Sequence, residues 1–247
     1  MNILVCISHV PDTVAKINFI ENHTKFDKDG VQYIINPYDE FVLARALQLK
    51  EQLGAKITVA LVGNQSSENT LRKSLSVGAD EAIRIDGEPT DGYCVANDLA
   101  MVVSNGNYDL IMLGKESSDY NGAMVPAMLA AKLNYDYINA CIGFEFDGEF
   151  ATISRETEKG KEVLTCKLPL VIAGQKGIVE EKDLKIPNMR GLMMAKRKSI
   201  TVLASINSAE ATEIISYENL SEKKPCTMID AKNVKELAKI IYEESKS

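Results

Sequence analysis

The sequence is poor in the side chains that carry most enzyme chemistry. Its 247 residues include only two histidines, His9 and His23, which leaves little material for His-based catalysis or a zinc site. The five cysteines form no Cys-x-x-Cys pair and no metal-ligand spacing, so we expect reduced thiols and no metal site. The Gly-x-Gly-x-x-Gly, Walker A, Gly-x-Ser-x-Gly and His-Glu-x-x-His motifs are all missing. These absences weaken hydrolase, kinase and dehydrogenase interpretations, and no catalytic residue is predicted.

Positive charge and long apolar runs are also scarce. The net charge of -7 argues against a general nucleic-acid binder, because phosphate affinity comes from clustered Lys and Arg. No apolar run approaches the roughly 20 residues of a membrane-spanning helix. The apolar run Ile3–Ile7 is followed soon by Asp12, which indicates a core strand and not a signal peptide. We therefore expect a cytoplasmic protein without a membrane span.

Apolar runs and helix-start signals alternate along the chain in the manner of βαβ units. Short apolar runs predict strands, and helical spacing behind capping residues predicts the helices between them. The expected strands cover residues 2–8, 56–62, 82–85, 109–113 and 170–173. The fold class is therefore α/β, with a doubly wound, mostly parallel five-stranded sheet in a single domain over residues 1–205. Asp147-Gly148 between alternating strands predicts an antiparallel hairpin extension over residues 138–167.

Two segments lie outside this alternation. Residues 175–199 predict a long loop that carries methionines beside the basic cluster Lys196–Lys198. Such loops are usually functional, and exposed methionines adapt to the shape of a protein partner. The alternative is a short helix with its methionines in the core and a solvated basic end. Residues 206–247 form an expected C-terminal arm, with residues 217–228 extended over another chain and a last helix over 231–244.

Residues 107–133 predict a buried strand, a polar loop and a helix that together could bind phosphate. Ser118, Asp119 and Asn121 are plausible N-cap residues, and Gly122 would let the backbone come close to a ligand. Unpaired N–H groups and the positive end of the helix dipole favour an anion at such a helix start. The alternative is a plain strand-to-helix turn.

The topology predicts which loops meet this one. In a doubly wound sheet the crevice lies where the strand order reverses, so the ends of strands 2–8 and 109–113 should be neighbours. Small residues there would admit a flat base, Asn36 and Asp39 could hydrogen-bond base or ribose, and the 114–124 loop could take phosphate. The residues by themselves therefore predict a nucleotide-binding α/β protein.

Several motifs occur in the order of one known family. They are the Ile3–Ile7 run with Val10-Pro-Asp12, the Asn36–Glu40 helix start, Leu71–Asp80, Leu113–Lys115, Arg155–Ala173 and Ala195–Lys198. With this set the sequence resembles the β subunit of electron transfer flavoproteins over nearly its whole length. The motifs are specific as a set and not singly.

The resemblance implies a non-catalytic subunit of a heterodimer. In that family the α subunit holds most of the FAD site, and the pair carries electrons from dehydrogenases to a quinone reductase or another acceptor. The β subunit typically buries a structural AMP, and its C-terminal arm contacts the α subunit. The implied cofactor-binding residues, with Thr13 near the flavin, are Cys6, Ser8, Thr13, Asn36, Pro37, Tyr38, Asp39, Val62, Lys115, Ser117, Ser118, Asp119, Asn121, Gly122, Ala123 and Met124.

The resemblance also implies a recognition segment over about residues 180–198, whose apolar tip falls at Met189. The implied partner-binding residues are Met189, Arg190, Leu192, Lys196 and Arg197.

One loop departs from the family pattern. Residues Glu116–Asn121 are fewer than the family's usual phosphate loop and lack its Asp-Gly-Asp-Thr form, which counts against a second FAD and leaves a pocket with AMP or with nothing. A stand-alone adenine-nucleotide-binding protein of the universal-stress type is the alternative function. A nucleotide hydrolase or synthase would need a Gly-rich phosphate-gripping motif that the sequence lacks.

Overall fold

The computed structural model describes residues 1–219, 226 and 228–245. The chain forms two compact units, one of Met1–Asn18 with Asp27–Ile214 and one of Phe19–Phe26 with Ile215–Ser247. Of the segment 217–228 that was expected to be extended, residues 220–225 and 227 lie outside the described residues. The predicted domain boundary after residue 205 stays a prediction.

The larger unit is built on a nine-stranded sheet in the order β11-β10-β9-β12-β8-β1-β6-β7-β13. Every adjacent pair from β9 to β13 in this order is parallel, while β10 pairs antiparallel with β9 and with β11. The strands are β1 Asn2–Cys6, β6 Lys56–Val62, β7 Glu81–Asp86, β8 Leu110–Gly114, β9 Asp136–Phe146, β10 Ala151–Thr157, β11 Gly160–Cys166, β12 Leu170–Gly174 and β13 Thr201–Ala204. The predicted doubly wound α/β class and the hairpin extension are confirmed.

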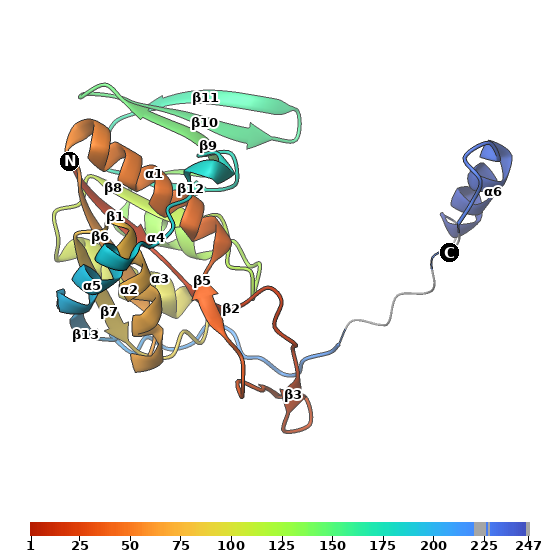
Figure 1. The fold of residues 1–247 in the computed structure, drawn as a ribbon, viewed down its shortest axis with the longest axis horizontal. Helices are drawn as coiled ribbons and strands as arrows, with labels where there is room; N and C mark the ends of the chain where they lie inside the picture. Colours follow the sequence, from red (N-terminus) through yellow and green to blue (C-terminus); the bar gives the residue numbers. More distant parts are fainter. Residues whose placement is uncertain (220–225, 227, 246–247) are drawn as a thin grey trace. The chain divides into compact units, whose positions relative to one another are not determined.

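Helices cover both faces of this sheet (Figure 1). Alternate residues of β1 point to opposite faces, so Ile3 and Val5 join one buried cluster with α1 and α2, and Leu4 joins another with α3 and α4. The helices are α1 Pro37–Leu53, α2 Glu68–Val77, α3 Gly92–Ser104, α4 Val125–Leu133, α5 Met189–Arg197 and α6 Val234–Glu244, with 3₁₀ turns at Gln65–Ser67 and Glu181–Asp183. Within the described part of the chain, no helix has both the length and the apolar character to span a membrane.

Four short strands form two small antiparallel sheets. In the larger unit β2, His9–Pro11, pairs with β5, Tyr33–Ile35. In the smaller unit β3, Phe19–Ile20, pairs with β4, Lys25–Phe26. There the Phe19 ring stacks on Tyr217 with centroids 4.7 Å apart, and Tyr217 N donates to the His23 carbonyl over 2.7 Å. The C-terminal segment of the smaller unit is therefore held to its hairpin at Tyr217.

Asp98 of α3 and the N-cap residue of the helix, Asp91, hold the segment that follows β13. Asp98 Oδ1 accepts hydrogen bonds from Ser205 Oγ, over 3.1 Å, and Ile206 N, over 2.9 Å. Asp91 caps α3 by accepting from Cys94 N over 2.7 Å, and its second oxygen accepts from Ala211 N over 2.6 Å. Residues 205–211 are thereby fixed to the larger unit.

Two expectations about secondary structure need correction. The sheet contains more than the five predicted strands, because β9 pairs parallel with β12 and the mostly exposed strand β13 extends the far edge beside β7. The segment 175–199 is not a continuous loop, because it contains the 3₁₀ turn Glu181–Asp183 and helix α5. Gly191 inside the helix and Pro187 just before it weakened the helical signal in the sequence.

Candidate functional site

The strand order reverses between β1 and β8, so the carboxyl ends of these strands flank the crevice of the sheet. Their register places Cys6 beside Leu113. Hydrogen bonds join three segments at this edge, namely the residues after β1, the first turn of α1 and the loop after β8. The structure therefore brings together Ser8, Asn36, Asp39 and the start of the 114–124 loop, as the topology predicts.

Asp39 links α1 to both strands. Its carboxylate accepts a hydrogen bond from Ser8 N on Oδ2 and another from Gly114 N on Oδ1, each over 2.7 Å. The side chain is only 3% exposed, and this burial raises the pKa of Asp39 to about 7. A Cβ at position 114 would lie 2.3 Å from Asp39 Oδ1, so only glycine lets the strand end come this close.

Asn36 links the start of α1 to the loop after β8. Its side-chain amide donates to the Glu116 carbonyl over 2.9 Å, and its Oδ1 accepts from Ser118 N over 3.1 Å. Asn36 N also donates to the Ser8 carbonyl over 3.1 Å. The side chain is 1% exposed and makes no cap hydrogen bond to α1. Of the other predicted residues of this turn, Pro37 starts the helix and Tyr38 lies half-buried against Gly114.

The loop after β8 is held by hydrogen bonds to β12 and Asn36 and by others within the loop. Lys115 N donates to the Gly174 carbonyl and Asn121 N to the Ser117 carbonyl, each over 2.8 Å. Tyr120 N donates to Asp119 Oδ1 over 2.9 Å. The predicted residues Asp119, Asn121, Gly122, Ala123 and Met124 are all exposed.

The predicted caps of α4 are wrong. The helix begins at Val125 with Met124 in the N-cap position, and no side chain caps it. Asn121 and Ala123 have positive φ angles of 48° and 49°, so the chain turns sharply after the polar residues and cannot continue from them into the helix. Pro126 in the first turn favours a start at this later point.

Cys6 and Val62 lie beneath this edge, in the cluster that contains Leu4 and Leu113. Burial raises the pKa of the Cys6 thiol, and the Asp39 carboxylate adds to the rise. Both side chains are therefore buried at this edge, and their role in cofactor binding stays a prediction.

Thr13 lies on an exposed turn beyond β2. Asp12 fixes this turn, because its carbonyl accepts from Ala15 N over 2.8 Å and its Oδ1 accepts from Val14 N over 3.1 Å. Val14 at the same turn is 87% exposed. The turn thus presents Thr13 and Val14 to solvent.

One pair near this edge was missed by the sequence reasoning. The His9 and Tyr33 rings stack with centroids 4.5 Å apart, and His9 Nδ1 shares a 2.7 Å hydrogen bond with Thr70 Oγ1. Burial, helped by Lys28, lowers the pKa of His9. Burial, followed by the charges of Asp119 and Glu88, raises the pKa of Tyr33. Strands of three residues give no periodic signal, so only the fold reveals this contact.

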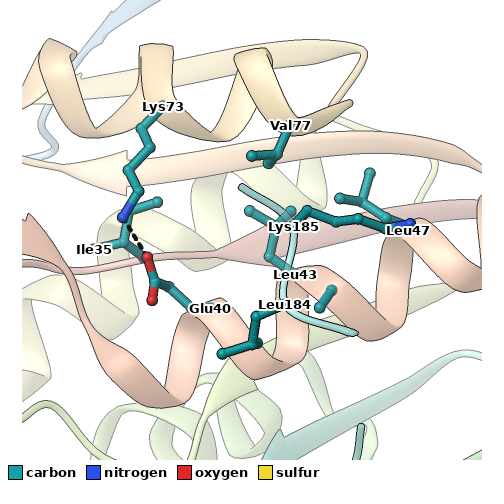
Figure 2. Close-up of a pocket in the computed structure, with 9 residues that line it drawn as sticks. Ile35, Glu40, Leu43, Leu47, Lys73, Val77, Leu184 and Lys185 are labelled. Carbon is teal, nitrogen blue, oxygen red and sulfur yellow. Dashed lines mark hydrogen bonds and ion pairs between the residues drawn. The ribbon is translucent and has the colours of Figure 1, made fainter. Parts of the chain in front are cut away.

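A small cavity lies between α1 and α2 (Figure 2). It has a volume of about 30 Å³ and is lined mainly by Ile35, Leu43, Leu47, Val77 and Leu184. The Lys73–Glu40 ion pair lies beside it. This volume holds about one water molecule, so the cavity is a packing gap and not a cofactor site.

Helix α5 packs against α2 through a close backbone contact. A Cβ on Gly191 would lie 2.2 Å from the Ser76 carbonyl oxygen, and Asn188 Oδ1 caps the helix by accepting from Gly191 N over 2.8 Å. Arg72 donates to the Ala195 carbonyl over 2.8 Å, and Lys198 Nζ donates to the Ala79 carbonyl over 2.6 Å. Hydrogen bonds thereby fix the C-terminal end of the helix to the domain, and its N-terminal turn packs on α2 at Gly191.

The opposite side of α5 is an exposed apolar surface with basic residues around it. Met189 is 75% exposed and Met193 60%, and Leu192 and Met194 are also exposed. Arg190, Lys196 and Arg197 are exposed on the same helix. The short helix of the earlier alternative is therefore present, but its methionines do not lie in the core.

Comparison with known proteins gives one consistent family. The family model described as "Electron transfer flavoprotein domain" matches residues 24–207. The electron transfer flavoprotein subunit beta of Syntrophomonas wolfei is 32% identical over 219 residues, which cover 88% of this chain and 85% of that protein. The subunit beta of Bacillus subtilis is 33% identical over 207 residues, 82% and 79% of the two chains. That of Megasphaera elsdenii is 32% identical over 212 residues, 81% and 77% of the two chains.

The raised pKa of Asp39 predicts how stability depends on pH. Between 3.8, its usual pKa, and about 7, the folded protein keeps a proton that the unfolded chain releases. The contribution of Asp39 to the free energy of unfolding should therefore fall as pH rises through this window. Above about pH 7 this contribution should no longer change with pH. Asp39→Asn removes the titrating group, so urea unfolding at several pH values should show a shallower slope for the variant. Equal slopes in the two proteins would contradict the assignment.

The contact at Gly191 predicts a specific loss of order in α5. Gly191→Ala should push α5 away from α2, since the new Cβ would overlap the Ser76 carbonyl, and should destabilise the protein by about 1–3 kcal/mol. Amide exchange of residues 189–197 should then become faster than exchange in α2. Gly92→Ala is the matched control, because its Cβ would meet its nearest neighbour at 3.4 Å. Equal exchange in the two variants would rule out this packing role.

Proposed function

This chain belongs to the electron transfer flavoprotein family, and from that premise we propose that it is the β subunit of a heterodimer that carries electrons between dehydrogenases and an acceptor. The match of the family domain to residues 24–207 carries this proposal. It favours the electron-carrier function over a stand-alone nucleotide-binding protein. In this proposal the chain supports a redox cofactor and docks partners without catalytic residues of its own.

FAD is the proposed cofactor, held mostly by the α subunit and shared with this chain at the interface. When bound, FAD supplies the redox chemistry. The exposed turn at Thr13 and Val14 supports this assignment, because a fixed turn with solvent-exposed side chains can contact a flavin held by a partner. Thr13 is the residue of this chain that we assign to the flavin.

The C-terminal arm, residues 206–247, is the proposed contact with the α subunit. Helix α6 carries an apolar stripe of Val234, Leu237 and Ile241, at the i, i+3 and i+7 spacing of one helix face. These three side chains are 66%, 45% and 59% exposed. An exposed stripe of this kind is typical of a helix that is completed by another chain.

The exposed surface of α5 is the proposed docking site for dehydrogenases, with a quinone reductase or another acceptor receiving the electrons. Flexible methionines can fit donors of different shape, and Arg190, Lys196 and Arg197 would favour an acidic partner surface. The packing of α5 on α2 and its fixed C-terminal end support this role, because a docking helix that is already ordered costs less entropy on binding.

Copurification with the α subunit tests the function. The purified pair should show flavin absorbance and release about one FAD for each heterodimer, and this chain expressed alone should be colourless because most of the flavin site lies in the other subunit. Absorption spectra and chromatography of the released cofactor check both expectations. A well-folded pair that contains no flavin would contradict the proposal.

Truncation of the α5 surface tests the docking assignment. Met189→Ala should slow reduction of the flavin by a donor dehydrogenase by roughly five-fold at low protein concentration, since loss of a central interface anchor costs more than about 1 kcal/mol. Its flavin content should not change. Leu53→Ala, which truncates an exposed leucine at the end of α1, is the control. Donor kinetics that are equal in both variants would count against the assignment.

A further inference from the structure

We infer that three residues of α3 and its N-cap form a latch for the start of the C-terminal arm, and that assembly with the α subunit depends on this latch. The latch consists of Asp91, Cys94 and Asp98. It holds the segment 205–212 after β13, which we call the arm root. The inference rests on the proposed function, because the arm is the part of the chain that we assign to the α subunit.

The latch residues share one face of α3. Asp91, Cys94 and Asp98 have the i, i+3 and i+7 spacing that places side chains on the same side of a helix. Each of them contacts the backbone of the arm root. Two are carboxylates that accept from N–H groups, and the third is a thiol that donates to a carbonyl. This face of α3 is therefore suited to bind a chain that forms no helix or strand.

Asp91 divides its two oxygens between the helix and the arm root. Its Oδ1 accepts from Cys94 N over 2.7 Å and caps α3. Its Oδ2 accepts from Ala211 N over 2.6 Å and from Thr212 N over 3.0 Å. Partial burial opposes ionisation, but these hydrogen bonds outweigh it and lower the pKa of Asp91 to about 2. The carboxylate is therefore charged at neutral pH and can only accept hydrogen bonds.

Asp98 and Cys94 hold the earlier part of the arm root. The buried Asp98 uses a single oxygen, Oδ1, to accept from both Ser205 Oγ and Ile206 N. Cys94 Sγ donates to the Ser208 carbonyl over 3.3 Å. Hydrogen bonds to the latch thus occur at the beginning, the middle and the end of the arm root.

Apolar burial does not explain the position of the arm root. Ile206 is 50% exposed, and residues 209–212 are all exposed. The segment 205–212 has no helical or strand hydrogen bonding of its own. Because hydrogen bonds to charged groups are stronger than those between neutral groups, the two carboxylates determine where this part of the chain runs.

A held arm root lowers the cost of binding the arm to another chain. The arm continues beyond Thr212 to α6, whose exposed apolar stripe we assign to the α subunit. Backbone that is ordered before binding adds no entropy cost when the complex forms. The latch orders residues 205–212 in advance and fixes the point from which the arm leaves α3. Opening the latch should therefore weaken the heterodimer.

The same substitution at the two aspartates tests the latch, because their oxygens are used differently. Asp91→Asn keeps Oδ1 for the cap, and asparagine caps helices as well as aspartate, but its amide group would face Ala211 N. Asp98→Asn removes the same charge but keeps the one oxygen that Asp98 uses. Asp91→Asn should raise the dissociation constant of the purified α–β complex about ten-fold, as expected for a lost hydrogen bond to a charged group. Asp98→Asn should change it less than about two-fold.

A second variant acts from the side of the arm root. Ala211→Pro removes the N–H that donates to Asp91 and leaves the residues of α3 unchanged. It should weaken the complex as Asp91→Asn does. In both variants the amides of the arm root should exchange faster, while the amides of α3 keep their protection and the assembled complex keeps its FAD.

Three results would overturn the inference. One is an unchanged dissociation constant in both Asp91→Asn and Ala211→Pro. Another is equal weakening by Asp91→Asn and Asp98→Asn, because loss of charge would then explain the effect. The third applies where Asp91→Asn loosens α3 itself, and it is an unchanged dissociation constant in Ala211→Pro. A wild-type complex without flavin would contradict the proposed function alone, since the dissociation constants would still test the latch.

Discussion

The buried carboxylate of Asp39 is the interaction on which this edge of the molecule depends. It joins the first turn of α1 to the ends of β1 and β8, the two strands between which the sheet reverses its order. Buried backbone N–H groups at strand ends need acceptors, and one side chain supplies two of them. The approach of Gly114 to Asp39 is so close that a larger residue would separate strand and helix. Asn36 extends the same arrangement into the next loop, so the position of that loop follows from the position of α1.

Most of the sheet could be predicted because burial on both faces leaves a clear pattern. β1, β6, β8 and β12 are continuous apolar runs in the sequence, and each is buried in the structure. The meeting of Asn36 and Asp39 with the loop after β8 also followed from topology alone. The sequence could not reveal which groups Asn36 and Asp39 hydrogen-bond. Asn and Asp are the residue types that bind nucleotides and equally the types that satisfy loop backbone, and only coordinates distinguish the two uses.

The wrong or missed secondary-structure predictions also have physical causes, because tertiary contacts or backbone turns outweigh the local sequence pattern. α5 contains Gly191, which lowers helix propensity but permits the contact with Ser76, so tertiary packing outweighs the local preference. β13 is short and mostly exposed, and its pairing with β7 is a long-range property. The start of α4 moved past the polar residues because two positive φ angles redirect the chain. The stacking of His9 on Tyr33 likewise depends on elements far too short to show periodicity.

The residues proposed for cofactor contact and for partner docking lie on different elements from those that stabilise the fold. The buried hydrogen bonds of Asp39 and Asn36 hold the fold together, the exposed turn at Thr13 is available to a cofactor held by another chain, and the exposed methionines of α5 are available to partners. α5 packs on α2 at Gly191, is fixed at its C-terminal end and is exposed on its other side, which suits repeated docking better than a disordered segment would. In the proposed function this chain positions a redox group and a partner, and that task needs no catalytic residue of its own.

An experimental density map of the α–β complex would test the account most directly. The account predicts FAD at the subunit interface near Thr13, with Asp39 in contact with Ser8 and Gly114 and Asn36 in contact with Glu116 and Ser118. FAD bound away from Thr13, or Asp39 and Asn36 turned away from these partners, would contradict it.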